Sequence, residues 1–138
     1  MARIYTSNWK DYELIDAGHN QKLERWGKVV TIRPERNAYF TPVLSQKEWV
    51  SKAHFRFNEQ SNTKGYWESL RGNFEDHWMV KAGALCFNLK LTQFKHIGIF
   101  PEQKNNWDFI TNRLNSGDRF LNLFGYCLLY TSPSPRDA

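Results

Sequence analysis

Residues 12–34 of the chain are YELIDAGHNQKLERWGKVVTIRP. Apolar and polar residues alternate here over short runs, and turn-forming residues interrupt the alternation twice, a pattern typical of antiparallel strands joined by tight turns. It predicts one strand on each side of the DAGHN turn and, after Gly27, a third strand over 29–32 that Pro34 ends. The residues therefore predict a small antiparallel meander.

A short helix is expected to follow the meander. The segment SQKEW at 45–49 has the form of a capping box, in which Ser45 accepts from the backbone N–H of Glu48 and the Glu48 side chain reaches back. The helix should run to about Ala53. The polar stretch NEQSNTKG at 58–65 is predicted to be a loop.

Period-two alternation returns in residues 84–91. It predicts a strand with one face on a core, and we interpret Cys86 as a small packing residue rather than a nucleophile. The apolar positions of this strand are Leu85, Phe87, Leu89 and Leu91.

A second helix and a final strand are expected near the end of the chain. Pro101 suits the first position of a helix, whose apolar face would carry Trp107, Ile110 and Leu114 before NSG ends it. The run FLNLF at 120–124 is apolar on both faces and predicts a buried strand, with Leu121 and Leu123 in the core.

Composition limits the class of protein. The 138 residues are 41% hydrophobic and 16% aromatic, enough for one core, and the net charge of +5 is compatible with a polyanionic partner without demonstrating one. No apolar stretch is long enough to span a bilayer, and the N-terminus lacks a secretory signal, so a cytoplasmic protein is expected. Two cysteines and four scattered histidines give neither a disulfide framework nor the ligand spacing of a zinc site.

Four blocks of the sequence carry a resemblance to a known family. Together they resemble the N-terminal part of a bacterial class I S-adenosylmethionine-dependent methyltransferase related to the ribosomal RNA large-subunit cytosine methyltransferases. The resemblance covers residues 11–126. The blocks are YELIDAGHNQKLERWG, TIRPERNAYFTP, FKHIGIFPEQKNNWDFI and RFLNLFGY.

The fold class expected from the residues and the resemblance is α+β. An antiparallel β-rich domain at 11–99, preceded by an extension at 1–10, would lead into 100–126, the truncated start of a Rossmann-like methyltransferase domain with only its first strand. Residues 127–138 resemble the translation of a sequencing adapter. We expect this tail to be an artefact without a packing role, and the natural protein to continue beyond Tyr126.

The resemblance implies the cofactor S-adenosyl-L-methionine and two places that would contact it. Phe124, Gly125 and Tyr126 enter the turn after the first strand of the methyltransferase sheet, where little side-chain bulk lets the backbone approach a ligand. Phe100 and Gln103 lie at the start of the second helix and would pack on the adenosine and hydrogen-bond the ligand. The alternative, that Phe100 is core and Gln103 an exposed helix residue, stays open. The resemblance assigns no catalytic residue and no metal ligand.

RNA, and ribosomal RNA in particular, is the partner that the resemblance implies. Basic residues in the meander and beside it lie among aromatic ones, a mixture that can meet phosphates and stack bases, although charged outer faces of strands are the default. These residues are Lys22, Arg25, Lys28, Arg33 and Arg36, with Trp26 and Tyr39.

Two functions stay open on the sequence. In the first, the chain is the front part of an RNA methyltransferase and is itself inactive. In the second, it is a non-catalytic α+β module that binds RNA or another ligand.

Overall fold

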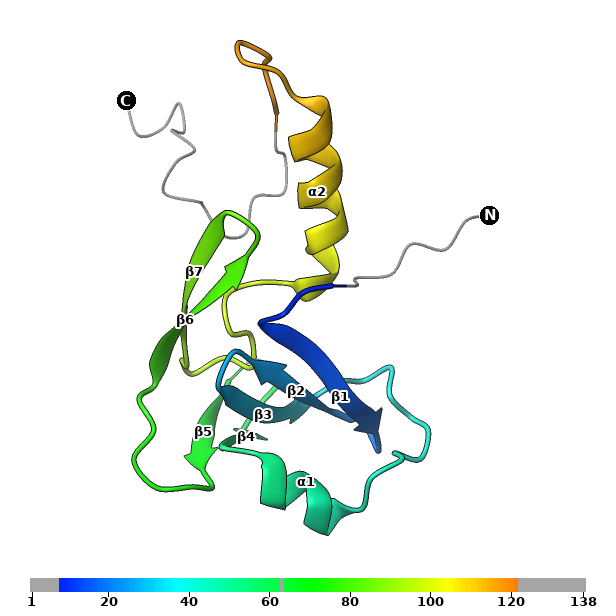
Figure 1. Ribbon diagram of the computed structural model, residues 1–138. Helices are drawn as coiled ribbons and strands as arrows, with labels where there is room; N and C mark the ends of the chain where they lie inside the picture. The colour runs from blue at the N-terminus through cyan, green and yellow to red at the C-terminus, as the bar shows by residue number, and fades with distance from the viewer. Residues whose placement is uncertain (1–7, 63, 122–138) are drawn as a thin grey trace.

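The computed structural model describes residues 8–62 and 64–121, which form a five-stranded sheet, a two-stranded sheet and a few short helices (Figure 1). The predicted α+β class is confirmed. In chain order the elements are β1 Tyr12–Gly18, β2 Gln21–Trp26, β3 Val29–Pro34, α1 Gln46–Lys52, β4 Phe55–Glu59, β5 Gly65–Ser69, β6 His77–Ala82, β7 Leu85–Lys90, the 3-10 helix η1 Pro101–Gln103 and α2 Lys104–Arg113.

The predicted meander is present as β1, β2 and β3, which pair antiparallel in that order. His19 and Asn20 form the first turn with positive φ angles of 49° and 59°. Such angles are uncommon outside glycine, and asparagine tolerates them best, so the GHN sequence suits the turn.

Strand β3 lies at the centre of the larger sheet and is buried on both faces. Val29 packs into one core cluster and Val30 into the other, so neither face of this strand is exposed to solvent. It pairs parallel with β4, and α1 makes the crossover between them. The β4–β5 hairpin then completes the sheet order β1-β2-β3-β4-β5.

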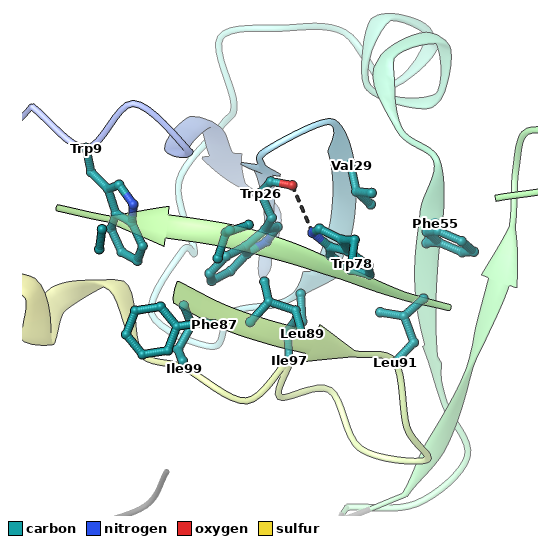
Figure 2. Close-up of a cluster of buried hydrophobic side chains, with 12 residues drawn as sticks. Trp9, Trp26, Val29, Phe55, Trp78, Phe87, Leu89, Leu91, Ile97 and Ile99 are labelled. Carbon is teal, nitrogen blue, oxygen red and sulfur yellow. Dashed lines mark hydrogen bonds between the residues drawn. The ribbon is translucent and has the colours of Figure 1, made fainter. Parts of the chain in front are cut away.

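The larger core lies between this sheet and the β6–β7 hairpin, with the chain that follows β7 closing it (Figure 2). Trp26 and Trp78 meet at its centre, where the Trp78 indole N–H donates to the Trp26 carbonyl at 3.0 Å. The predicted strand is confirmed as β7, since Phe87 and Leu89 are buried while Asn88 and Lys90 are exposed. Trp9, which precedes β1, is 6% exposed and belongs to the same core.

The smaller core lies under α1 on the opposite face of the sheet. The predicted capping box is present: the backbone N–H of Glu48 donates to the Ser45 hydroxyl at 3.3 Å, and the Ser45 N–H donates to the Glu48 carboxylate at 2.8 Å. The helix ends at Lys52, with Ala53 as its C-cap. It buries Trp49, whose indole N–H donates to Asp16 at 2.9 Å.

Asp16 ties β1 to the segment before α1. It is 8% exposed and accepts hydrogen bonds from the backbone N–H groups of Ala17, Val43 and Leu44 as well as from Trp49. Burial alone would raise the pKa of this carboxyl, but the four donors outweigh it and hold the pKa below its ordinary value.

Three expectations from the sequence were wrong. The stretch 58–65 is not all loop, because Asn58 and Glu59 end β4 and Gly65 begins β5; its polar residues disguise a hairpin at the sheet edge. Cys86 is exposed on the outer face of β7, so it does not pack in the core. Leu121 is 76% exposed and not in a strand, since no described strand lies beside it to cover an apolar run.

Some expectations lie outside the described residues. The remainder of the predicted strand at 120–124 and the tail at 127–138 are among them, and the division into domains stays a prediction. No helix in the described ranges is long and apolar enough to cross a membrane.

We predict that Asp16→Asn lowers the free energy of unfolding by about 1–3 kcal/mol. The new side-chain NH2 group would face N–H donors of the protein, and those donors would lose their acceptor. The folded pKa is depressed, so the stabilisation by Asp16 is present above the unfolded pKa of about 3.9 and is lost as pH falls through the folded value. Urea unfolding at neutral and acidic pH measures both effects.

The matched control is Asp108→Asn, which removes an exposed carboxylate paired with Lys104 on α2. It should change stability by less than about 0.5 kcal/mol. Equal effects of the two substitutions would contradict the role given to Asp16.

Candidate functional site

A cleft of about 710 Å³ opens where residues 8–14 meet the 3-10 helix η1. Trp9 and Tyr12 form an aromatic wall, their ring centroids 5.4 Å apart, and Pro101 and Glu102 form the side contributed by η1. The remaining lining residues are Asn8, Lys10, Glu13, Leu14 and Arg25. The cleft thus joins flat apolar surface to charged groups of both signs, a combination suited to a ligand with a ring and polar substituents.

A buried ion pair lies behind the cleft, on the face of the sheet that carries the larger core. Glu24 of β2 is fully buried and Arg33 of β3 is 4% exposed. Arg33 donates to both carboxylate oxygens of Glu24, from Nε to Oε2 at 2.5 Å and from Nη2 to Oε1 at 2.9 Å. This two-pronged arrangement is the strongest geometry that arginine offers to a carboxylate.

Tyr12 connects the ion pair to the cleft. Its hydroxyl donates to Glu24 Oε1 at 2.9 Å. Burial, followed by the charge of Glu24, raises the pKa of Tyr12, so the hydroxyl keeps its proton and acts as a donor. Burial alone would lower the pKa of Arg33, but Glu24 more than compensates and raises it.

Arg33 also fixes the segment that leads to η1. Its Nη1 donates to the backbone carbonyl of Lys95 at 3.3 Å, and the next residue, His96, meets the ring of Phe100 edge-on with centroids 5.5 Å apart. Partial burial and then the positive charges of Arg33 and its neighbours lower the pKa of His96, which is therefore neutral at pH 7. One buried side chain thus links the central strand to the predicted site.

The two predicted site residues in η1 have different environments. Phe100 is half-buried as the N-cap of η1, next to His96. Gln103 is exposed, and its side-chain oxygen accepts from the Asn106 amide at 2.8 Å. Pro101 takes the first helical position, as predicted. Pro101 and Glu102, between the two predicted residues, are the ones that line the cleft.

The other predicted site residues, Phe124, Gly125 and Tyr126, lie outside the described residues. The structure therefore brings Phe100 and Gln103 to one short element beside the cleft but does not test the second half of the predicted site. Among the described residues, no group of histidine, cysteine, aspartate and glutamate could hold a metal ion.

The basic residues of the meander do not form one surface. Arg33 and Trp26 are buried, the latter fully, so neither can contact a nucleic acid. Lys22 pairs with Glu35 at 3.0 Å and Arg25 with Glu13 at 3.2 Å. The sequence of β2 does not show which of its basic residues are accessible. Lys22, Glu24 and Trp26 lie on one face of the strand, and the β6–β7 hairpin and the segment after β7 partly cover that face.

Sequence reasoning missed Trp9, Tyr12 and Glu102 as cleft residues. Trp9 falls in what the sequence indicates is an extension, and only the folded chain brings it next to η1. The buried ion pair, by contrast, had a signal in the sequence, because β2 and β3 each carry an oppositely charged residue on the same face of the sheet. In the strand register Lys22 lies opposite Arg33 and Glu24 opposite Thr31, so Glu24 and Arg33 are diagonal neighbours.

Comparison with known proteins finds similarity to a solved structure. The chain is similar to a solved structure, "Crystal Structure of the SAM Dependent Methyltransferase from Agrobacterium tumefaciens", with 30% identity, a TM-score of 0.73, and coverage of 82% of this chain and 35% of that chain. No family model and no curated protein matches. The chain spans about a third of the length of that relative and shares the fold of that part, which supports the predicted resemblance to S-adenosylmethionine-dependent methyltransferases at this level.

We predict that Glu24→Gln lowers the free energy of unfolding by about 3–5 kcal/mol, because it leaves the Arg33 charge buried without its partner. Glu13→Gln, which breaks the exposed pair with Arg25, serves as the control and should cost less than about 1 kcal/mol. Chemical unfolding of the three proteins measures the difference. A loss for Glu24→Gln no larger than that of the control would show that the buried pair does not stabilise the fold.

Proposed function

We propose that this chain is part of an S-adenosylmethionine-dependent methyltransferase whose substrate is RNA, ribosomal RNA in particular. The observation that carries the first half is the 30% identity to a solved methyltransferase at a TM-score of 0.73. The chain corresponds to 35% of that protein, so we assign it a share of cofactor binding and no catalytic residue, and we expect it to be inactive by itself.

The residues around η1 fit a nucleoside-containing cofactor. Phe100 offers an aromatic edge next to the cleft, and Gln103 offers an amide in the first turn of the helical segment. Pro101 has no backbone N–H, and those of Gln103 and Lys104 donate to the carbonyls of Phe100 and Pro101, so the side chains of this segment would make the contacts with a ligand. S-adenosylmethionine, when bound, supplies the methyl group; Phe100 would pack on its adenosine and Gln103 would hydrogen-bond it. From sequence alone, Phe124, Gly125 and Tyr126 would add a second wall.

RNA as the substrate rests on the resemblance to ribosomal RNA methyltransferases and is compatible with the net charge of +5. A methyltransferase of this kind accelerates the reaction mainly by positioning the methyl donor against a base presented to it. On this proposal the described part of the chain helps to hold cofactor and substrate, and it acts inside the cell, where RNA is found.

We predict that S-adenosylmethionine binds this chain weakly, with a dissociation constant on the order of 1 mM, because each missing polar contact of about 1–1.5 kcal/mol costs close to a factor of ten. Titration of the labelled chain by NMR should shift the amide signals of Phe100, Glu102 and Gln103 most. Micromolar binding would contradict the assignment of only a partial pocket.

The matched pair of variants is Gln103→Ala and Gln93→Ala, two exposed glutamines of which only the first belongs to η1. Gln103→Ala should raise the dissociation constant of S-adenosylmethionine severalfold, and Gln93→Ala should leave it unchanged. Signal shifts confined to residues away from 100–103, or none at millimolar cofactor, would overturn the placement of the site.

A further inference from the structure

The loop at 35–44 combines a firmly held backbone with exposed large side chains. Tyr39 is 84% exposed, Phe40 is 53% exposed and Val43 is 92% exposed. The rings of Tyr39 and Phe40 meet edge-on with centroids 6.2 Å apart. Single exposed apolar residues are ordinary, but adjacent aromatic rings held outward on a fixed loop call for a partner.

Hydrogen bonds along the loop fix the backbone that carries the rings. The first turn of the meander holds one side: the N–H of His19 donates to the Phe40 carbonyl at 2.9 Å, and that of Asn20 to the Ala38 carbonyl at 2.6 Å. Asp16 holds the far end through the N–H groups of Val43 and Leu44.

Close packing adds to this anchoring. Ala38, which directly precedes the two exposed rings, is only 2% exposed and packs against the rest of the protein. Gly18 lies so close to Pro42 that a Cβ on Gly18 would come within 2.4 Å of the Pro42 nitrogen. The rings are therefore presented with little backbone entropy left to lose on binding.

The surroundings of the rings favour a polyanion with flat faces. His19, Asn20 and Arg36 are exposed at the same turn and loop, and they supply hydrogen-bond donors and a positive charge. The neighbouring carboxylates are engaged within the protein: Glu35 pairs with Lys22 at 3.0 Å, and Asp16 is buried among its four donors. An aromatic pair bordered by arginine and amide groups is the combination on which unpaired bases stack while the backbone phosphates are neutralised.

We propose that the loop at 35–44, with the first turn of the meander, is a stacking platform for unpaired bases of single-stranded RNA. Tyr39 and Phe40 stack the bases and Arg36 contacts the phosphate backbone. The inference rests on the proposed RNA substrate and deepens it by naming where, on this chain, single-stranded RNA is held. Of the surface expected from the sequence it keeps Arg36 and Tyr39, whereas Arg33 and Trp26 are buried.

The test measures binding of a short fluorescent single-stranded RNA of mixed sequence by anisotropy at fixed low salt. Tyr39→Ala and Phe40→Ala should each weaken binding about tenfold, the loss expected for one stacked base. Tyr39→Phe, which keeps the ring, should bind like the original chain. The same sequence in duplex form should bind more weakly, because its bases are not available for stacking.

Two controls separate stacking from general effects. Val43→Ala removes an exposed apolar side chain from the same loop without touching a ring, and Phe109→Ala removes a 59% exposed ring from α2. Both should bind RNA like the original chain. Ultraviolet crosslinking of the unmodified chain to the same RNA, followed by peptide mapping, should mark the peptide that contains Tyr39 and Phe40, and this readout does not depend on any variant folding.

The outcomes distinguish this inference from the function on which it rests. RNA binding that the ring substitutions leave unchanged, or crosslinks only outside 35–44, overturns the platform while leaving an RNA substrate possible elsewhere. No binding of single-stranded RNA overturns the platform and the RNA half of the proposed function together. Cofactor shifts at 100–103 report on the methyltransferase half in either case. Preferential binding of the duplex would likewise overturn stacking as the mechanism.

Discussion

The ion pair between Glu24 and Arg33 is the interaction on which the arrangement of this protein most depends. Both side chains are buried between the central strands and the segment that follows the hairpin. Such a pair is not by itself strong evidence of stability, since the loss of hydration offsets much of the attraction. Its effect is on position: it aligns β2 with β3, receives the hydroxyl of Tyr12, and through Arg33 holds the carbonyl of Lys95.

The candidate site follows from this positioning. Once the chain is anchored at Lys95, the buried residues Ile97 and Ile99 enter the larger core and set where η1 begins. The 3-10 helix then faces Trp9 and Tyr12 across the cleft. A segment with little regular structure is thereby held in place by a charge pair and two aliphatic side chains, which is the kind of rigid support that a binding site needs.

Much of the fold could be predicted from the sequence because its signals are local. The meander, the capping box of α1 and the alternation of β7 each depend on residues within a few positions of one another. The β4–β5 hairpin was missed because Asn58 and Glu59 are polar residues at the end of β4, beyond its pairing with β3, where burial does not require apolar side chains. The burial of Arg33 and Trp26 could not be predicted, because it depends on the hairpin and on residues 95–99, far along the chain. The sequence pointed to Phe100 and Gln103 through the family resemblance. It did not point to Tyr12, because only the folded chain brings β1 next to η1.

Hydrogen exchange on a double variant, Glu24→Leu with Arg33→Met, tests the positioning role of the pair, because this variant removes the pair without leaving an unpaired charge. We expect amides within 97–103 to exchange faster, because their anchor to β3 is gone, and amides of α1, on the other face of the sheet, to keep their protection. Unchanged exchange at 97–103, with the sheet intact, would contradict the claim that this ion pair positions the candidate site.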